Sequence, residues 1–319
     1  MYANIFYPSL SKLRGPFRLL RLFNLFYSFF EGRQLEPSSK ILNQVLYRSK
    51  TCCIELFLKP NNVNGELACV FSAGANRNLE GNGHGGEVLI NEGFDVLLFK
   101  INNDDWFQQL PPSIWKHIEK SLAKHLYVRR VGTGTSMGGY AAIAFSKLLN
   151  LETVLAYSPQ YRIDSNFDQR WAEFSKNIIW RYRITFDSIN RNCKYLIVFD
   201  PCGADGLQVN YLKEIIPSPN LMLWSISHSG HCATRFLHEL NQLKLVTVQA
   251  LKRLSFQGIS LQRKSNSIQY IINLALSLEK RNQLKRAQYV LEFGINKHKI
   301  TNLDHEIFKR LENIKNTIS

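Results

Sequence analysis

The sequence predicts an α/β fold with a mostly parallel sheet that helices cover on both faces. Short runs rich in apolar, β-branched and aromatic residues alternate with helical patterns through the middle of the chain, an order of elements typical of parallel sheets. Most of these runs are apolar at nearly every position, as expected of strands covered on both sides. A chain of 319 residues has room for one large domain with smaller attachments.

The predicted elements divide the chain into three parts. Strands are predicted at residues 52–58, 67–72, 94–99, 127–132, 153–157, 194–199 and 221–226, and helices at 113–125, 137–149, 208–215 and 232–243. We therefore place the α/β domain at residues 51–247, between an N-terminal segment, 1–50, and a C-terminal tail, 248–319.

The two flanks carry most of the charge. The net charge is +15 at pH 7, of which residues 1–50 contribute +6 and residues 251–319 contribute +8. Basic ends of this kind suit an anionic polysaccharide or an anionic membrane surface. Nucleic acid is not an expected partner, because the sequence has no helix-turn-helix, RNA-binding or zinc motif.

The flanks also have their own patterns. Residues 17–30 combine a broad Leu and Phe face with Arg at helical spacing, which predicts either an interfacial membrane helix or a helix packed on the domain or on a partner. The tail predicts a helical hairpin, residues 268–278 and 284–297, with small residues spaced much as in one tetratricopeptide repeat. The hairpin would form a partner or homo-oligomer surface, or a cap on the domain.

Cysteine usage and hydropathy bear on the compartment. The six cysteines form no CxxC pair and no metal-binding spacing, so neither a metal site nor a disulfide framework is expected. No apolar run reaches the length of a membrane span, and the N-terminus lacks a signal-peptide pattern. We expect a cytoplasmic protein, held peripherally at the inner membrane face if residues 17–30 bind lipid.

The strongest chemical signal is the run GTSMG at residues 134–138, followed by Gly139. It lies between the predicted strand 127–132 and the predicted helix 137–149. A serine on so sharp a turn takes strained backbone angles, and flanking glycines remove the side chains that would clash. Ser136 would then stand at the carboxyl edge of the sheet, where a helix N-terminus favours developing negative charge. The alternative is an ordinary glycine-rich turn that binds phosphate or nothing.

This motif in this setting resembles the α/β-hydrolase superfamily, whose chain order is nucleophile, acid, histidine. The resemblance implies an acid after the strand 194–199 and a histidine after the last strand. Asp200 and Asp205 follow the first of these strands, and His228 and His231 follow the second. Both residue types therefore stand at the implied strand ends and in the implied order.

Each of these two positions has a rival. Asp205 follows a Gly-Ala pair and precedes a helical run, a form common for the family's acid, whereas Asp200 could orient the loop through an Asx turn. His231 follows a glycine ahead of a helix, as the family's histidine usually does, whereas His228 is nearer the strand. We favour Ser136, His231 and Asp205 as the catalytic set, with Asp200 and His228 as alternatives.

The resemblance also implies the remaining roles. The oxyanion would be bound by the backbone N–H of Met137 and by that of Ala73 or Gly74, in the loop after an early strand.

Three further residues follow strands at the same edge and are expected to line the substrate site. Asp105 and Trp106 follow the strand 94–99, and Ser158 follows the strand 153–157. Trp106 could equally cover the core as a buried ring.

A narrower resemblance concerns the substrate. Residues 134–145 (GTSMGGYAAIAF), then 154–160 (VLAYSPQ) and a strand ending in Asp, resemble a bacterial group of α/β-hydrolase-like proteins associated with surface-polysaccharide biosynthesis, some of them capsule O-acetyltransferases. This implies a carbohydrate or other small acyl ester as substrate. We predict a serine esterase without a cofactor. The alternatives are an O-acetyltransferase acting on a polysaccharide, with acetyl-coenzyme A as donor, and a catalytically inactive hydrolase-fold scaffold.

Overall fold

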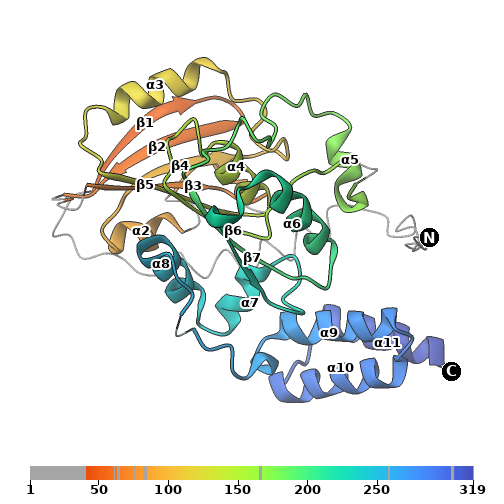
Figure 1. Cartoon of the computed structure of the whole chain (residues 1–319). Coiled ribbons are helices and arrows are strands. Elements are labelled where there is room, and N and C mark those ends of the chain that lie inside the picture. The colour runs from red at the N-terminus through yellow and green to blue at the C-terminus, as the bar shows by residue number, and fades with distance from the viewer. Residues whose placement is uncertain are drawn as a thin grey trace. The chain divides into compact units, whose positions relative to one another are not determined.

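The sheet of the computed structural model has eight strands in the order β1-β2-β4-β3-β5-β6-β7-β8 (Figure 1). The strands are β1 (Leu42–Arg48), β2 (Cys52–Leu58), β3 (Glu66–Phe71), β4 (Asp95–Ile101), β5 (Arg129–Thr135), β6 (Thr153–Tyr157), β7 (Lys194–Phe199) and β8 (Leu221–Ser225). β2 runs antiparallel to both of its neighbours, and all pairs from β4 through β3 to β8 are parallel. The predicted mostly parallel sheet is confirmed.

The structure describes residues 41–318 except 61, 63–64, 75–76, 82–84, 165–166, 258 and 303–304. The amphipathic helix predicted at residues 17–30 lies outside this range. The helices are α2 (Gly86–Asn91), α3 (Ser113–Leu122), α4 (Met137–Ala144), α5 (Ala172–Ser175), α6 (Ala204–Ile215), α7 (Ala233–Glu239), α8 (Leu243–Arg253), α9 (Ile268–Lys280), α10 (Leu284–His298) and α11 (Glu306–Ile318), with short 3-10 turns at Gln169–Trp171, Ser218–Asn220 and Lys264–Asn266.

The strand β1 was not expected from the sequence. It pairs antiparallel with β2, so the sheet begins before residue 51. Only Leu46 of this edge strand is buried, and four residues in a row at its start are exposed. A strand without apolar alternation gives no periodic signal in the sequence.

Helices cover both faces of the sheet, and each face has its own core. Residues of α3, α4 and α6 pack with one face, whereas residues of α2, α7 and α8 pack with the other (Figure 1). The five strands β4, β3, β5, β6 and β7 are therefore largely shielded on both sides, as their continuous apolar runs predict, whereas the edge strand β8 is partly exposed.

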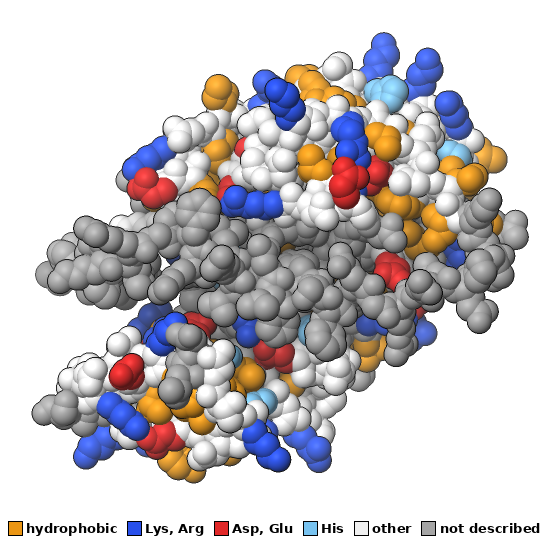
Figure 2. Space-filling model, turned by 180° about the vertical axis from the view of Figure 1, so that it is seen from behind, with side chains coloured by type: hydrophobic (Ala, Val, Ile, Leu, Met, Phe, Trp, Pro, Cys, Tyr) orange, Lys and Arg blue, Asp and Glu red, His pale blue; other side chains and the backbone are white. Residues whose placement is uncertain are grey.

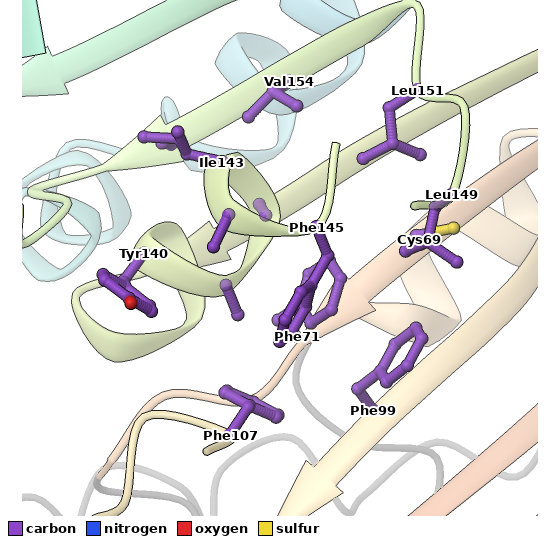
Figure 3. Packing of buried hydrophobic residues seen from close by; sticks show 14 of the residues in the cluster. Cys69, Phe71, Phe99, Phe107, Tyr140, Ile143, Phe145, Leu149, Leu151 and Val154 are labelled. Carbon is purple, nitrogen blue, oxygen red and sulfur yellow. The ribbon is translucent and has the colours of Figure 1, made fainter. Parts of the chain in front are cut away.

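Aromatic rings fill the layer between α4 and the sheet. Phe71 of β3 stacks on Phe99 of β4 at 4.6 Å between ring centroids, and Phe145 at the end of α4 lies 5.9 Å from Phe71 (Figure 3). Phe107 meets Phe71 edge-on at 5.8 Å. These contacts fix the height of α4 above β3, and α4 begins at the residue after Ser136.

The tail contains the predicted hairpin, α9 and α10, followed by a third helix, α11. Ala275, Ala287 and Gly294 are the small residues whose spacing suggested close helix packing. The first two are fully buried, and a Cβ on Gly294 would lie 2.7 Å from Ile271. The hairpin is thus closely packed, with its own apolar cluster.

The tail is also tied to the α/β domain. The carboxylate of Glu239, at the end of α7, accepts hydrogen bonds from the Ser267 hydroxyl (2.6 Å) and the Gln269 N–H (3.1 Å). These two residues begin α9. The contact attaches the tail to the helix that follows β8.

Charged side chains are spread over the surface. On the face in Figure 2, Lys and Arg side chains lie over the upper part of the molecule and over the C-terminal helices below, with Asp and Glu side chains between some of them. Within the described ranges, no helix is long and apolar enough to cross a membrane.

A buried ion pair links β2 and β4 and offers a test of the sheet. Lys100 is fully buried and pairs with Glu55, which is 5% exposed, while its Nζ also donates to the Gly81 carbonyl at 3.0 Å. We expect Lys100→Met to lower the free energy of unfolding by about 3–5 kcal/mol, because it leaves the Glu55 carboxylate buried and unpaired. Lys100→Met/Glu55→Leu should recover most of that loss in urea unfolding. An equal loss in the single and double variants would contradict this assignment.

Candidate active site

Ser136 stands on the sharp turn between β5 and α4. Its backbone has φ 55° and ψ −114°, a conformation that residues other than glycine rarely adopt. The strain is held by tertiary contacts, since the Ser136 N–H donates to the Tyr157 carbonyl of the neighbouring strand at 2.8 Å. The turn lifts the Ser136 side chain to the carboxyl edge of the sheet.

Two glycines make this turn possible. A Cβ on Gly134 would lie 2.3 Å from the carbonyl carbon and oxygen of Gly138, and a Cβ on Gly138 would lie 2.5 Å from the carbonyl oxygen of Phe71. Backbone approaches backbone at both positions, so a side chain has no room to turn aside. The GTSMG run therefore has the steric role that the sequence predicted for it.

The structure brings Ser136, His231 and Asp205 into one hydrogen-bonded chain. The Nε2 atom of His231 lies 2.8 Å from the Ser136 Oγ. Its Nδ1 atom lies 2.9 Å from Oδ1 and 3.0 Å from Oδ2 of Asp205. The three residues come from the turn after β5, the start of α6 and the loop after β8, and only the fold places them together.

The environment of Asp205 sets the tautomer of His231. Asp205 is 2% exposed, and burial opposes its ionisation, but the charges and hydrogen bonds of His231 and Arg170 outweigh burial and lower its pKa to about 2. An ionised carboxylate only accepts hydrogen bonds, so Nδ1 of the imidazole carries a proton. In the neutral ring Nε2 is then left to accept the Ser136 hydroxyl.

Asp200, the alternative acid, is used differently. Its Oδ1 accepts the Cys202 N–H at 2.8 Å, which is the Asx turn considered from the sequence, and the His228 N–H at 3.1 Å. Its Oδ2 accepts the Gly230 N–H at 2.7 Å. Asp200 thus ties the end of β7 to the loop that carries His231.

His228, the alternative base, points elsewhere. Its backbone has φ 65°, and its ring lies 6.0 Å from the ring of Tyr270 on α9. Burial lowers the pKa of its imidazole. The His228 ring thus packs towards α9, whereas His231 contacts both Ser136 and Asp205.

The residues expected to bind an oxyanion lie beside this turn. Met137 is the first residue of α4. A Cβ on Gly74 would lie 3.9 Å from the Met137 Cε atom, so the loop with Ala73 and Gly74 runs past the start of α4. Ala73 and Gly74 are both partly exposed. The loop that carries Gly74 therefore lies next to the side chain of Met137.

The three residues expected to line the substrate site are buried. Asp105 accepts the N–H groups of Phe107 (2.9 Å) and Gln109 (3.3 Å), which closes its own turn. Trp106 is 2% exposed and donates from Nε1 to the Gln160 side chain at 2.8 Å. Ser158 is fully buried with φ 43°. Their side chains are therefore buried within the protein, and the hydrogen bonds of Asp105 and Trp106 are made to neighbouring protein groups.

Residues between β6 and β7 contribute contacts that the sequence analysis did not identify. Arg170 donates from Nη2 to Asp205 at 3.0 Å and from Nε to Asp168 at 2.9 Å. The ring of Trp171 lies 5.4 Å from that of His231 and 6.0 Å from that of Trp106. Residues 158–193 show no long periodic run, so no pattern in the sequence pointed to them.

Two buried N–H groups near the triad have no hydrogen-bond partner among the described residues. They are Nε1 of Trp171, whose ring contacts His231, and Nε2 of Gln160, whose Oε1 accepts from Trp106. A buried donor without a partner costs free energy, so such groups commonly meet a water or a ligand. An oxygen-rich molecule would supply acceptors. Within the described residues, no group of three His, Cys, Asp or Glu side chains could hold a metal ion.

Comparison with known proteins finds likeness in fold. No protein-family profile and no curated protein matches this chain. Among solved structures, a capsule O-acetyltransferase of Neisseria meningitidis serogroup A is 10% identical, with 69% of this chain and 97% of that chain covered, at a TM-score of 0.47. A mutant of the esterase E40 is 11% identical, with 78% and 94% covered and a TM-score of 0.49.

An esterase of Pyrococcus furiosus is 14% identical, with 70% of this chain and 95% of that chain covered, at a TM-score of 0.47. The identities are too low to carry any activity to this chain. The topology of the chain itself shows the expected α/β-hydrolase-like fold. Its sheet order, its helices on both faces and the strained turn at Ser136 define that class.

The glycines of the turn can be tested against a glycine that has space. We expect Gly138→Ala to lower the free energy of unfolding by about 3 kcal/mol, the upper end of the cost of overpacking, because its Cβ would lie 2.5 Å from the Phe71 carbonyl oxygen. Gly203→Ala is the control, since a Cβ there meets nothing within 4 Å. Urea unfolding of both variants measures the difference, and equal stabilities would refute the steric argument.

Proposed function

We propose that this protein is a serine acyl-transfer enzyme that hydrolyses an ester. Ser136 is the nucleophile, His231 the base, and Asp205 the carboxylate that orients His231. The observation that carries the proposal is the continuous hydrogen-bonded chain from the Ser136 Oγ through His231 to Asp205. Serine is a weak nucleophile without an adjacent base, and this arrangement supplies one. A scaffold without activity would have no use for a strained serine joined to an oriented imidazole.

The proposed reaction has two halves. Ser136 Oγ attacks the ester carbonyl carbon while its proton passes to Nε2 of His231, and the carbonyl electron pair moves to the oxygen. The tetrahedral intermediate then breaks its bond to the alcohol, which leaves with the proton from Nε2. Water repeats the sequence on the acyl-enzyme and releases the acid. Asp205 holds the imidazole and stabilises its charged form throughout.

Backbone N–H groups at Met137 and in the loop with Gly74 would bind the developing oxyanion. The Met137 N–H belongs to the first turn of α4, whose N–H groups have no partners within the helix. A second N–H from Ala73 or Gly74 would complete the pair, since the loop passes the Met137 side chain. Two preorganised donors at this point would stabilise the tetrahedral intermediate more than the ground state.

The substrate class that the site suits best is a carbohydrate ester. Indole and imidazole rings lie side by side at Trp171 and His231, and sugars commonly lie against such surfaces. The unpartnered N–H groups of Trp171 and Gln160 would donate to sugar or acyl oxygens. Transfer of an acetyl group from acetyl-coenzyme A to a polysaccharide hydroxyl uses the same acyl-enzyme and is the alternative outcome of the test below.

The first test of this proposal is nucleophile replacement. With p-nitrophenyl acetate we expect a burst of nitrophenolate from the wild type and none from Ser136→Ala, because only the wild type forms an acyl-enzyme. Product analysis with and without oligosaccharide acceptors then separates free acetate from acetylated sugar, and acetyl-coenzyme A serves as the second donor. If both proteins stay at background and a fluorophosphonate labels neither, the scaffold interpretation replaces this proposal.

The second test compares the two candidate acids. We expect Asp205→Asn to reduce kcat by about 10⁴-fold, because an amide favours the wrong imidazole tautomer. Asp200→Asn keeps an acceptor for part of the loop, and the resulting small displacement of His231 should cost at most about 100-fold. Steady-state kinetics on the two purified variants measures both losses. The reverse order of losses would make Asp200 the acid.

A further inference from the structure

Arg170 stands between two buried carboxylates. Its Nε and Nη2 atoms lie 2.9 and 2.6 Å from the two oxygens of Asp168, a fork-to-fork contact, and Nη2 also lies 3.0 Å from Oδ1 of Asp205. Asp168 is 4% exposed and Asp205 2% exposed. Two carboxylates buried side by side would repel each other strongly, and the single guanidinium between them removes that cost.

The position of Arg170 is fixed from several directions. The Asp168 carboxylate also accepts the Arg170 N–H at 3.2 Å and the Gln208 amide of α6 at 2.9 Å. The other end of the Gln208 amide accepts the Tyr161 N–H at 2.6 Å. The segment that carries Arg170 is thereby attached to α6, the helix whose first turn carries Asp205.

The same short turn touches the base. Trp171 follows Arg170 directly, and its ring lies 5.4 Å from the His231 imidazole. The Asp205 Oδ1 atom therefore receives Arg170 from one side and His231 Nδ1 from the other, at 3.0 and 2.9 Å. Rotation of the Asp205 carboxylate would break both contacts at once.

We propose that Arg170 is a positioning residue of this site, which holds the Asp205 carboxylate in the orientation that its hydrogen bond to His231 requires, while Asp168 holds Arg170. This inference rests on the function proposed above and extends it to a chain of five residues, from Ser136 to Asp168. Arg170 acts in two separable ways. The fork on Asp168 fixes the guanidinium, so that its Nη2 atom holds the Asp205 carboxylate in orientation. The positive charge of Arg170 offsets part of the negative charge that faces the imidazole.

The loss of the fork and the loss of the charge can be separated by two substitutions of Arg170. Arg170→Gln removes charge and fork, so the orientation of Asp205 loosens and the imidazole faces two uncompensated carboxylates. Arg170→Lys keeps the charge but offers a point donor in place of the fork. Among the described residues, Cys232 interacts electrostatically with both Asp205 and Arg170, and burial raises the pKa of its thiol to about 11. Cys232 also interacts with Arg235 and Glu306, and none of these three groups changes in these variants.

The experiment combines imidazole titration with kinetics on the full chain. His231 is followed by NMR of ¹⁵N-histidine-labelled protein across pH, in the wild type, Arg170→Gln and Arg170→Lys. The matched control is Arg162→Gln on the same segment, since the Arg162 side chain pairs with the exposed Asp164. Thermal unfolding of each variant checks that it is folded. The double variant Asp168→Asn/Arg170→Gln leaves no unpaired charge at Asp168 and is therefore expected to fold even if Arg170→Gln does not.

In Arg170→Gln we expect the midpoint of the His231 titration to rise by about one pH unit or more, because a cation within 6 Å has been lost. The kcat for p-nitrophenyl acetate should fall at least about tenfold. Arg170→Lys should keep the wild-type midpoint but lose part of kcat, and Arg162→Gln should match the wild type in both. A pattern of this kind would separate positioning from a purely structural role, which would lower stability without moving the midpoint.

Either of two results would overturn the inference. One is an unchanged midpoint of the His231 titration in a folded Arg170→Gln variant, and the other is an unchanged kcat in the folded double variant. The NMR result does not depend on esterase activity. A shifted midpoint in a protein whose activity survives Ser136→Ala would therefore leave the role of Arg170 standing and remove the proposed nucleophile instead.

Discussion

The structure depends on one steric constraint, the close approach of the first turn of α4 to the ends of β3 and β5. Gly134 and Gly138 touch backbone to backbone, and the carbonyls of Phe71 and Ser72 press on Gly138. With any larger residue there, α4 could not dock on the aromatic layer beneath it (Figure 3). Ser136 would then not be forced to φ 55°, and the loop after β3 would not pass Met137. The site is a consequence of this contact.

Several residues with strained backbone angles lie at the same edge of the sheet, and others lie in turns elsewhere among the described residues. Positive φ values occur at Trp106 and Phe107 after β4, at Ser136 after β5, at Ser158 after β6 and at His228 after β8. Each such residue costs free energy of order 1–3 kcal/mol and persists only where its surroundings leave it no alternative. At Ser136 the surroundings include the hydrogen bond from its N–H to the Tyr157 carbonyl of β6. The strained turn at Ser136 therefore lies where the side chains of the proposed mechanism come together.

The C-terminal tail reaches this edge through α9. Gly230, in the loop with His231, has φ 70°, and a Cβ there would lie 2.4 Å from the Asn273 side chain. His228 of the same loop meets Tyr270, and Glu239 bonds to the start of α9. Asp200 holds the loop from the sheet side through the N–H groups of His228 and Gly230. The loop is thus fixed between β7 and the tail, so the tail supports the position of His231 directly.

The sequence by itself determined the class of the sheet, the central strands, and the glycine turn with its serine, because these depend on local periodicity and on steric limits within a few residues. It also ranked Asp205 and His231 over Asp200 and His228 by motif shape, and the tertiary contacts favour the same members of each pair. It did not reveal β1, whose exposed residues carry no period, or the contacts of Arg170, Asp168 and Trp171. Those residues are separated from Asp205 by 34 to 37 positions of irregular chain. Only the tertiary structure decided their contacts, because a charge network among buried side chains depends on distances that no spacing along the sequence encodes.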